Sequence, residues 1–549
     1  MFLRRTVNAW HFAHCLKNVP RTLSCYVLLL LIIHWDRYKV FWWAAQPAGQ
    51  QQRQQSQQRQ AHGTSPTTPQ AQNGAGGRDH VFIYSSFLYN RRPPSNFTEP
   101  GKVQLVVLFL AHKFHRSTDG LVCVVAKNAI SVQKMALQKE IVHSLGICAL
   151  DLFVLSCSVD GLSRDSTLFE DSNRSYASYR NIYSLVLTDG PRSQRQSTKL
   201  TLYPKVPSYK SRGLVLCISR VFLFEKWQLL ITALETAILA VYELMKAYER
   251  EGLLRVRPGI RFPHQRGMPW DPNAETEFNG QILLAHDCFY EYRHSAQFIG
   301  LIDWDDLLVP SRHFATLPEA FAAASGRPPR TQPTFWSTSS RQALRSSWVR
   351  CFLTKPSRFS LRKVLRHGIR IAQMYNDEKM VVRPTQLRGF WMHNSFLLES
   401  GKRPVKLYTN YSILLHLANE ERVLPGEFQT PFMAKHDIDG IHLHASTLLK
   451  NLDKQAKSSA AHQLPSAQPF YAALVACHSR IFAYYKSTGV NKSRCLSYSL
   501  CVLPEVPQAL CAITRNTFGT IMTKGARTAI HVREQSEFGH GRCTDEGGI

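Results

Sequence analysis

An apolar run that ends at three carboxylates constrains this chain most. Residues Phe298 to Ile302 are short and aliphatic between polar neighbours, and Asp303, Asp305 and Asp306 follow at once. A run of this length is typical of a strand buried on both faces of an α/β sheet. Ligands of such sheets bind outside the carboxyl ends of the strands, where two carboxylates spaced one residue apart can hold a divalent cation. The stretch therefore predicts a metal site that faces an anionic ligand.

The same pattern also has a simpler interpretation. Carboxylates that follow a strand often cap the next helix or lie in a solvated turn, and an Asp-x-Asp pair occurs by chance in most long chains. The rest of the sequence is needed to decide between a metal site and a capping or solvated turn.

Composition leaves several classes of protein open. The 549 residues are 44% hydrophobic, which is enough for one large core or two ordinary ones with tails to spare. A formal charge of +28 suits a nucleic-acid binder, but also a protein that works near anionic membranes or on anionic donors such as nucleotide sugars. The basic residues are dispersed, and no zinc-finger, helix-turn-helix or RNP-like pattern is present, so we expect no nucleic-acid partner.

The N-terminus predicts that the protein is anchored in a membrane. Basic residues precede the apolar run from Leu23 to Ile33, and Trp35 extends it to an interfacial aromatic residue. This arrangement is typical of a signal anchor, with residues 1–22 as a cytosolic tail and 23–45 as the transmembrane segment of a single-pass type II protein. Because a spanning helix needs about 20 apolar residues, a cleaved signal peptide is the alternative. Trp42 and Trp43 crowd the position where cleavage would occur, which favours the anchor.

A stem follows the anchor. Residues 46–78 are rich in Gln, Gly, Pro, Ser and Thr and nearly free of aliphatic side chains, so they are expected to stay disordered. Anchor, stem and folded domain together are the layout of a Golgi membrane enzyme with a lumenal domain. Four N-glycosylation sequons are compatible with that compartment: Asn96, Asn173, Asn410 and Asn491.

The 13 cysteines add little from sequence alone. A lumenal domain could form disulfides, but their pairing cannot be deduced from spacing. No CxxC pair is present, which argues against a zinc site.

The folded part is expected over residues 79–445, and residues 446–549 carry only scattered apolar runs. Residues 161–211 are polar and predict loops. Val81–Pro94 predicts a strand that runs into a proline-terminated turn, and further apolar runs of strand length are Val103–Ala111, Leu121–Ala126, Leu152–Cys157, Leu214–Arg220 and Leu253–Val256. Apolar residues at helical spacing predict helices over Glu225–Gly252 and Gly280–Tyr292. Alternating strands and helices favour an α/β sheet with the acidic cluster near its middle.

Several blocks in this order resemble glycosyltransferase family 92, the group first catalogued as domain of unknown function 23 and abundant in nematodes. The blocks are LVLCISRVFLFEKWQLL from Leu214, VYELMKAYEREGLLRV from Val241, GQILLAHDCFYEYR from Gly280, FIGLIDWDDLLVP from Phe298, KMVVRPTQLRGFWMHN from Lys379 and LLHLANE from Leu414. The resemblance covers roughly Val81 to Glu420.

The resemblance implies a GT-A-like fold, in which helices flank a mixed central sheet. It also implies a nucleotide-sugar donor such as UDP-galactose, a glycan or glycoprotein acceptor, and manganese. Asp303 and Asp305 match the metal-binding Asp-x-Asp of the family, and Asp306 replaces the Glu that usually follows. The two histidines of the later blocks fall on His393, expected at the substrate, and His416, expected as a third metal ligand or a donor to phosphate.

The reaction that the resemblance implies explains these residue types. Release of a sugar from UDP builds charge on the leaving diphosphate, which a metal on the aspartates would neutralise. Inversion at the sugar also needs a carboxylate to accept the proton of the acceptor hydroxyl. Asp306 and Asp287 are the candidates from the strongest blocks, with Asp437 and Asp439 beyond them, and each could instead be a solvated or capping residue. A lone histidine such as His416 is more often a hydrogen-bonded core residue.

Two departures from the family pattern keep other functions open. Thr236 runs straight into Ala237, where the family has a further strand, and Leu417 and Ala418 replace the expected Tyr-Arg after His416. We expect a membrane-anchored, manganese-dependent glycosyltransferase, and by type a galactosyltransferase. An inactive relative that binds a glycan or nucleotide sugar is the first alternative, and a metal-dependent nuclease is the second.

Overall fold

The computed structural model describes much of the chain between residues 79 and 542. The longer described stretches are 79–89, 103–112, 121–127, 131–134, 136–142, 146–159, 183–188, 197–218, 254–265, 270–303, 306–311, 313–324, 335–338, 341–346, 369–374, 379–393, 397–402, 404–407, 411–416, 468–488, 495–504, 510–522 and 528–542. The chain divides into two compact units, Met1–Ala75 and Gly76–Ile549, and all described residues belong to the second. The expected anchor, the stem, the Thr236–Ala237 junction and most of the helix expected from Glu225 lie outside the described residues.

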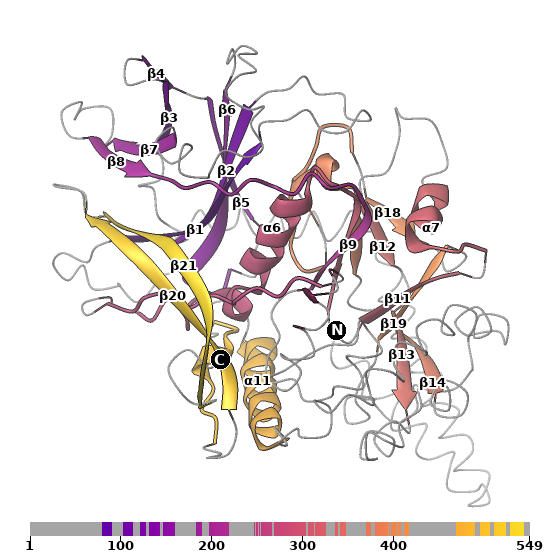
Figure 1. The fold of residues 1–549 in the computed structure, drawn as a ribbon. Helices are drawn as coiled ribbons and strands as arrows, with labels where there is room; N and C mark the ends of the chain where they lie inside the picture. The colour runs from indigo at the N-terminus through magenta and orange to yellow at the C-terminus, as the bar shows by residue number, and fades with distance from the viewer. Residues whose placement is uncertain are drawn as a thin grey trace, which may run out of the picture. The chain divides into compact units, whose positions relative to one another are not determined.

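The first sheet combines the two ends of the described chain. Its order is β20-β21-β1-β2-β6-β5. The strands are β1 (Asp79–Tyr89), β2 (Val103–His112), β5 (Ala136–Ile141), β6 (Leu150–Val159), β20 (Leu510–Met522) and β21 (Thr528–Arg542). All neighbours are antiparallel except β1 and β21, which run parallel with Phe82 opposite His531. The C-terminal hairpin therefore completes a sheet that the N-terminal strands begin, as Figure 1 shows in yellow and indigo.

A smaller sheet lies next along the chain. Its order is β4-β3-β7-β8, formed by β3 (Leu121–Lys127), β4 (Ser131–Lys134), β7 (Tyr183–Thr188) and β8 (Ser197–Thr201). Leu200 and Leu202 pack with Val81, Ile83 and other buried side chains of the first sheet. One face of the first sheet is thus covered by the chain that leaves β8.

The second sheet holds the apolar run that precedes the three carboxylates. Its order is β18-β12-β15-β10-β9, formed by β9 (Arg212–Ile218), β10 (Ala296–Ile302), β12 (Phe335–Thr338), β15 (Met380–Val382) and β18 (Pro404–Leu407). β10 runs parallel to β9 and antiparallel to β15. Along β10, Ile299 and Leu301 face one apolar cluster, whereas Phe298 and Ile302 face another. Burial on both faces explains the uninterrupted run and confirms the predicted strand.

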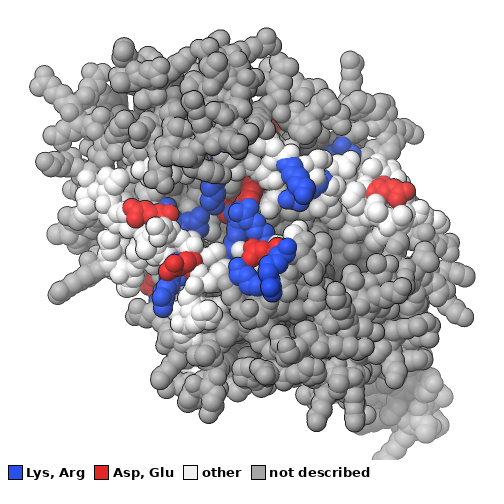
Figure 2. Space-filling view, viewed as in Figure 1, with Lys and Arg blue, Asp and Glu red and all other residues white. Residues whose placement is uncertain are grey.

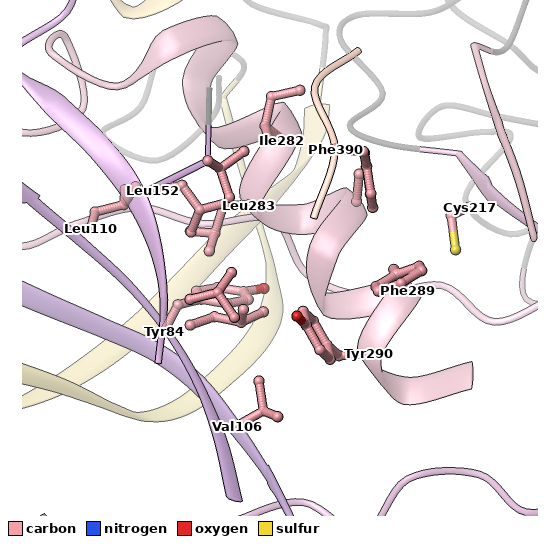
Figure 3. Packing of buried hydrophobic residues seen from close by; sticks show 14 of the residues in the cluster. Tyr84, Val106, Leu110, Leu152, Cys217, Ile282, Leu283, Phe289, Tyr290 and Phe390 are labelled. Atoms are coloured by element: carbon pink, nitrogen blue, oxygen red, sulfur yellow. The ribbon is translucent and has the colours of Figure 1, made fainter. Parts of the chain in front are cut away.

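Helix α6 (Gln281–Tyr292) lies between the first and second sheets (Figure 1). Its side chains Leu283, Phe289 and Tyr290 are buried in one cluster that also includes Val106 of β2 and Ile299 of β10. Figure 3 shows Leu283 and Tyr290 of this helix facing side chains of the first sheet. The helix is therefore the common core element of both sheets, and its prediction from sequence is confirmed.

Helix α7, a third sheet and a short strand pair complete the part of the second unit that follows β10. Helix α7 (Leu317–Ala324) covers the far face of the second sheet, where Phe321 packs against Phe298 with ring centroids 5.4 Å apart. A third sheet has the order β11-β19-β13-β14, from β11 (Asp306–Pro310), β13 (Arg341–Ser346), β14 (Ile369–Met374) and β19 (Ser412–His416). β16 (Leu387–Gly389) and β17 (Leu397–Leu398) form a short pair. Mixed sheets with helices on their faces agree with the α/β class expected from sequence.

Residues beyond 446 contain structure where only scattered apolar runs were visible in the sequence. Besides β20 and β21, they include α11 (Gln468–Thr488). Disulfides join Cys148 to Cys495 and Cys477 to Cys501, while a third joins Cys217 of β9 to Cys288 of α6. Residues 495–501 are therefore joined at one end to Cys148, which lies just before β6, and at the other end to Cys477 of α11.

Two expectations are corrected. Leu254 to Val256 are described and form no strand, because the Val256 N–H is bonded to the Glu249 carboxylate instead of to a neighbouring strand. The polar region 161–211 contains β7 and β8, which pair with each other, and β7 also pairs with β3. Among the described residues, no helix has the length and apolar character needed to cross a bilayer.

The disulfides generate the first testable prediction. Peptide mapping without reduction is expected to recover Cys148–Cys495, Cys217–Cys288 and Cys477–Cys501. Replacing Cys217 and Cys288 together by Ser should lower the free energy of unfolding by roughly 4 kcal/mol, because their bond closes a loop of 71 residues. The 24-residue loop of Cys477–Cys501 should cost roughly 3 kcal/mol. A different pairing pattern would contradict the arrangement of α6 on β9.

A buried histidine of α6 gives the second prediction. The Nε2 of His286 accepts the Phe390 N–H at 3.3 Å, so its Nδ1 carries the proton and donates to the Ile282 carbonyl at 2.8 Å. Burial lowers the pKa of His286 to about 4. The unfolded chain, with a histidine pKa near 6.5, therefore binds a proton that the folded chain does not, and stability should fall as pH drops from about 6.5 to about 4.

Denaturant unfolding at several pH values checks this. Each histidine of this kind contributes a slope of at most about 1.4 kcal/mol per pH unit within that window. His286→Gln keeps an acceptor and a donor but cannot titrate, so its slope should be smaller than that of the wild type. Equal slopes in the two proteins would show that His286 is not held neutral.

Candidate functional site

The acidic residues after β10 form a closed turn. The Asp303 N–H donates to the Asp306 carboxylate at 3.1 Å, and the Asp306 N–H donates to the Asp303 carbonyl at 3.1 Å. The Asp306 side chain has no exposed surface, whereas 36% of the Asp303 side chain is exposed. The turn therefore presents Asp303 outward and holds Asp306 inward, at the point where β10 ends and β11 begins.

A buried lysine lies against this turn. Lys379 directly precedes β15, and because β15 runs antiparallel to β10 with Met380 opposite Leu301, its start lies beside the end of β10. Its ammonium contacts the Asp303 Oδ2 and lies 3.4 Å from the Asp306 Oδ2. Lys379 is only 4% exposed. A buried ammonium between two carboxylates compensates charges that would otherwise be costly to remove from water.

The first residue of α6 reaches the same turn. The Gln281 side-chain amide donates to the Asp303 Oδ1 at 3.2 Å. Just before it, Phe278, Asn279 and Gly280 have φ values of 45°, 52° and 82°. Two non-glycine residues in this left-handed region are costly, and such conformations persist only where surrounding contacts enforce them.

The C-terminal segment supplies those contacts. The Asn279 side chain accepts the Tyr498 N–H at 2.5 Å and the Ser497 hydroxyl at 3.0 Å, and it donates to the Ser499 hydroxyl at 2.6 Å. The Phe278 N–H donates to the Leu496 carbonyl at 2.7 Å. Residues 496–499 follow Cys495, which is disulfide-bonded to Cys148. The strained turn that places Gln281 beside Asp303 thus depends on residues far away in the sequence.

The backbone of His416, the third predicted metal ligand, lies beside this turn. Asp306, the first residue of β11, is the register partner of His416, the last residue of β19. Asp305 and the side chain of His416 lie outside what the structure describes. Within the described residues, no three His, Cys, Asp or Glu side chains form a group that could hold a metal ion. The metal roles of Asp303, Asp305 and His416 therefore stay predictions, although Asp303 and the His416 backbone both lie beside Asp306.

Asp287 lies in a separate cluster of ion pairs. The Lys205 ammonium is 2.9 Å from Asp287 Oδ1, and the Arg257 guanidinium is 2.5 Å from Oδ2. Burial alone would raise the pKa of Asp287, but Lys205, Arg257 and Arg533 together hold it well below its usual range. Asp287 follows Gln281 by six residues, which places it about 9 Å along the helix axis and on another face of α6. These contacts describe a structural ion pair; its catalytic role remains a prediction without support from this geometry.

The remaining predicted residues are placed as follows. His393 lies in the segment between β16 and β17, with its ring edge-on to Trp391 at a centroid distance of 5.5 Å. Its role at the substrate stays a prediction. Outside the described residues lie Asp437, Asp439 and the four sequon asparagines, Asn96, Asn173, Asn410 and Asn491.

Charge on the described surface is mixed. In Figure 2, Lys and Arg side chains gather near the middle of the face together with Asp and Glu side chains. On this face the described basic residues do not form the continuous stripe that a nucleic-acid interface requires.

Sequence reasoning missed Lys379 and Gln281. Lys379 precedes the apolar triplet Met380–Val382, and Gln281 opens the helix block. Both belong to the sequence blocks quoted above, but only strand register and the left-handed turn bring them to Asp303. A lysine directly before a short buried strand was the one signal available.

Comparison with known proteins shows which family the residues around this site resemble. Residues 212–457 match the family model for glycosyltransferase family 92. Three glycosyltransferase family 92 proteins of Caenorhabditis elegans are 24%, 23% and 22% identical to the chain over 352, 326 and 336 residues. These alignments cover 58%, 54% and 56% of this chain. The resemblance inferred from the sequence blocks is confirmed.

The matches cover only part of this chain and only part of each relative. The chain spans 65%, 61% and 64% of the length of these three relatives. The family match includes Gln281, Asp303, Asp306 and Lys379, whereas residues 496–499, which hold the turn before Gln281, lie beyond it.

The turn before α6 gives the third prediction. Asn279→Ala removes three side-chain hydrogen bonds and leaves a Cβ at positive φ, so it should lower the free energy of unfolding by about 2–4 kcal/mol. Asn279→Gly loses the same bonds but tolerates the backbone conformation, and should be about 1 kcal/mol more stable than Asn279→Ala. Denaturant unfolding of both variants measures this. Wild-type stability in Asn279→Ala would show that the C-terminal segment does not hold the turn.

Proposed function

Residues 212–457 resemble glycosyltransferase family 92, and we propose that this protein transfers a sugar from a nucleotide-sugar donor to a glycan or glycoprotein acceptor. The observation that carries the proposal is that the matched region contains the whole described acidic turn, with Asp303 facing outward at the carboxyl end of β10. Ligands of α/β sheets bind at this edge. UDP-galactose is the proposed donor and fucose-containing glycans are the proposed acceptors, in keeping with the family resemblance.

Manganese is the proposed cofactor. Carboxylate oxygens are the ligands that Mn²⁺ and Mg²⁺ prefer, and Asp303 offers a carboxylate that is about one third exposed. The donor set therefore fits such an ion, which Asp303 and Asp305 would hold, with His416 as the third candidate. When bound, the ion would supply a positive charge for the diphosphate that leaves the sugar.

The protein's own residues have separable tasks in this proposal. Asp306, fully buried, fixes the turn by accepting the Asp303 N–H, and Gln281 and Lys379 fix the direction of the Asp303 carboxylate. A carboxylate without exposed surface is poorly placed to receive a proton from an acceptor hydroxyl. We therefore propose that Asp306 positions Asp303, and that the base is another carboxylate at the site.

Disulfides support a lumenal location. Three disulfides join described cysteines, and such bonds persist in the secretory pathway and outside the cell but are rare in the cytosol. Together with the apolar run at residues 23–33, this supports a single-pass type II membrane protein of the Golgi, with the anchor at 23–45 and a stem at 46–78.

An activity assay gives the fourth prediction. The full-length chain, produced in the secretory pathway of cultured cells, should transfer galactose from UDP-galactose to fucosylated N-glycans with Mn²⁺ and stop with EDTA. Asp303→Asn and Asp305→Asn should each lower the transfer rate roughly 100-fold or more, since each replaces a negatively charged ligand of the proposed ion by a neutral amide. Radiolabelled UDP-sugars measure the rate.

A matched variant separates chemistry from folding. Glu319→Gln neutralises a carboxylate in the first turn of α7, which bonds the Ala315 N–H, and should leave the transfer rate unchanged. Folded wild-type protein that transfers none of a panel of UDP-sugars would contradict the proposal and favour an inactive relative that binds glycans or nucleotide sugars.

A further inference from the structure

The Lys379 ammonium contacts the Asp303 carboxylate, to which the proposed cation would bind. The contact is to Asp303 Oδ2, while Gln281 donates to Asp303 Oδ1, so both oxygens of this carboxylate have protein partners. The same ammonium lies 3.4 Å from Asp306 Oδ2. Each carboxylate oxygen keeps a second lone pair, but a cation that binds Asp303 Oδ2 meets the positive charge of Lys379 on the same oxygen.

Burial makes the lysine more than an incidental neighbour. The Asp306 side chain has no exposed surface and the Lys379 side chain has 5%, so neither charge can be left without an opposite charge nearby. Two carboxylates and one ammonium carry a net charge of −1. The lysine thus lets the turn form with both aspartates ionised, and its charge reduces the attraction of the turn for any further cation.

We propose that Lys379 is an internal counter-ion that competes with a divalent cation for Asp303. The inference rests on the proposed function and deepens it. Binding of the cation displaces the Lys379 ammonium from Asp303 Oδ2, and the ammonium then stays with Asp306, from which it is already only 3.4 Å away. The site is in this way held in shape before the cation arrives, at the expense of cation affinity.

Competition and a purely structural role predict opposite changes in cation affinity when Lys379 is removed. Removing the ammonium should make the protein less stable, because two carboxylates lose their buried partner. It should also make the protein bind the cation more tightly, because the competitor is gone. If Lys379 only supported the shape of the turn, its loss would weaken both stability and cation binding.

The fifth prediction tests that direction with the purified full-length protein. Mn²⁺ binding is measured from the electron paramagnetic resonance signal of free Mn²⁺, and thermal unfolding is followed with Mn²⁺ or with EDTA. Lys379→Met should unfold at a lower temperature than wild type in EDTA, and should bind Mn²⁺ about tenfold more tightly, in line with the loss of one charged hydrogen bond. The rise in unfolding temperature caused by Mn²⁺ should also be larger than in wild type.

Two further variants control for charge and for burial. Lys379→Arg keeps the positive charge and should bind Mn²⁺ within about threefold of wild type. Lys205→Met removes a different, half-buried ammonium, which pairs with the buried Asp287, and should lower the unfolding temperature without changing Mn²⁺ affinity. The three variants together separate a local competition from a general loss of stability.

The results decide this proposal independently of the transfer reaction. Equal or weaker Mn²⁺ binding by folded Lys379→Met would overturn it, and so would a wild-type protein that binds no Mn²⁺ yet transfers sugar. Tighter binding by Lys379→Met in a protein that transfers no sugar would support the competition and reject the proposed function instead.

Discussion

Helix α6 carries carboxylates into the interior, and the rest of the fold is arranged to compensate them. Asp287 pairs with Lys205, from the chain between β8 and β9, and with Arg257, while Arg533 of β21 adds a further positive charge. A buried carboxylate without such partners would be strongly destabilising. These cations come from three segments far apart in sequence. Their convergence on one helix joins the segment before β9 and the C-terminal hairpin to the region that resembles a glycosyltransferase.

The same constraint operates near the first residue of the helix, where the candidate site lies. Asp306 is buried inside its turn and Lys379 is the cation beside it. Gln281 reaches Asp303 because three consecutive residues adopt positive φ, and that turn is held by residues 496–499. The site therefore draws on residues beyond the family match, which gives the C-terminal segment a role in positioning Asp303.

Much of the framework could be predicted from sequence alone. The run from Phe298 to Ile302 was correctly predicted as a buried strand because both faces are covered, and α6 was visible from the helical spacing of its apolar residues. The strand expected at Leu253 was wrong, since local apolar character cannot show that Val256 bonds to a side chain. Lys379 escaped notice because its position depends on antiparallel register, which no local pattern encodes. Disulfide pairing and the C-terminal hairpin likewise depend on contacts between distant segments.

We propose that Asp303 receives a divalent cation and gives up its contact with Lys379 in doing so. Crystals of the full-length protein grown with Mn²⁺ and UDP, measured at the manganese absorption edge, test it most directly. If Asp303 binds the ion, an anomalous peak will lie within coordination distance of an Asp303 carboxylate oxygen, with the Lys379 ammonium withdrawn toward Asp306. A manganese peak elsewhere, or Lys379 still on Asp303 beside bound UDP, would contradict it.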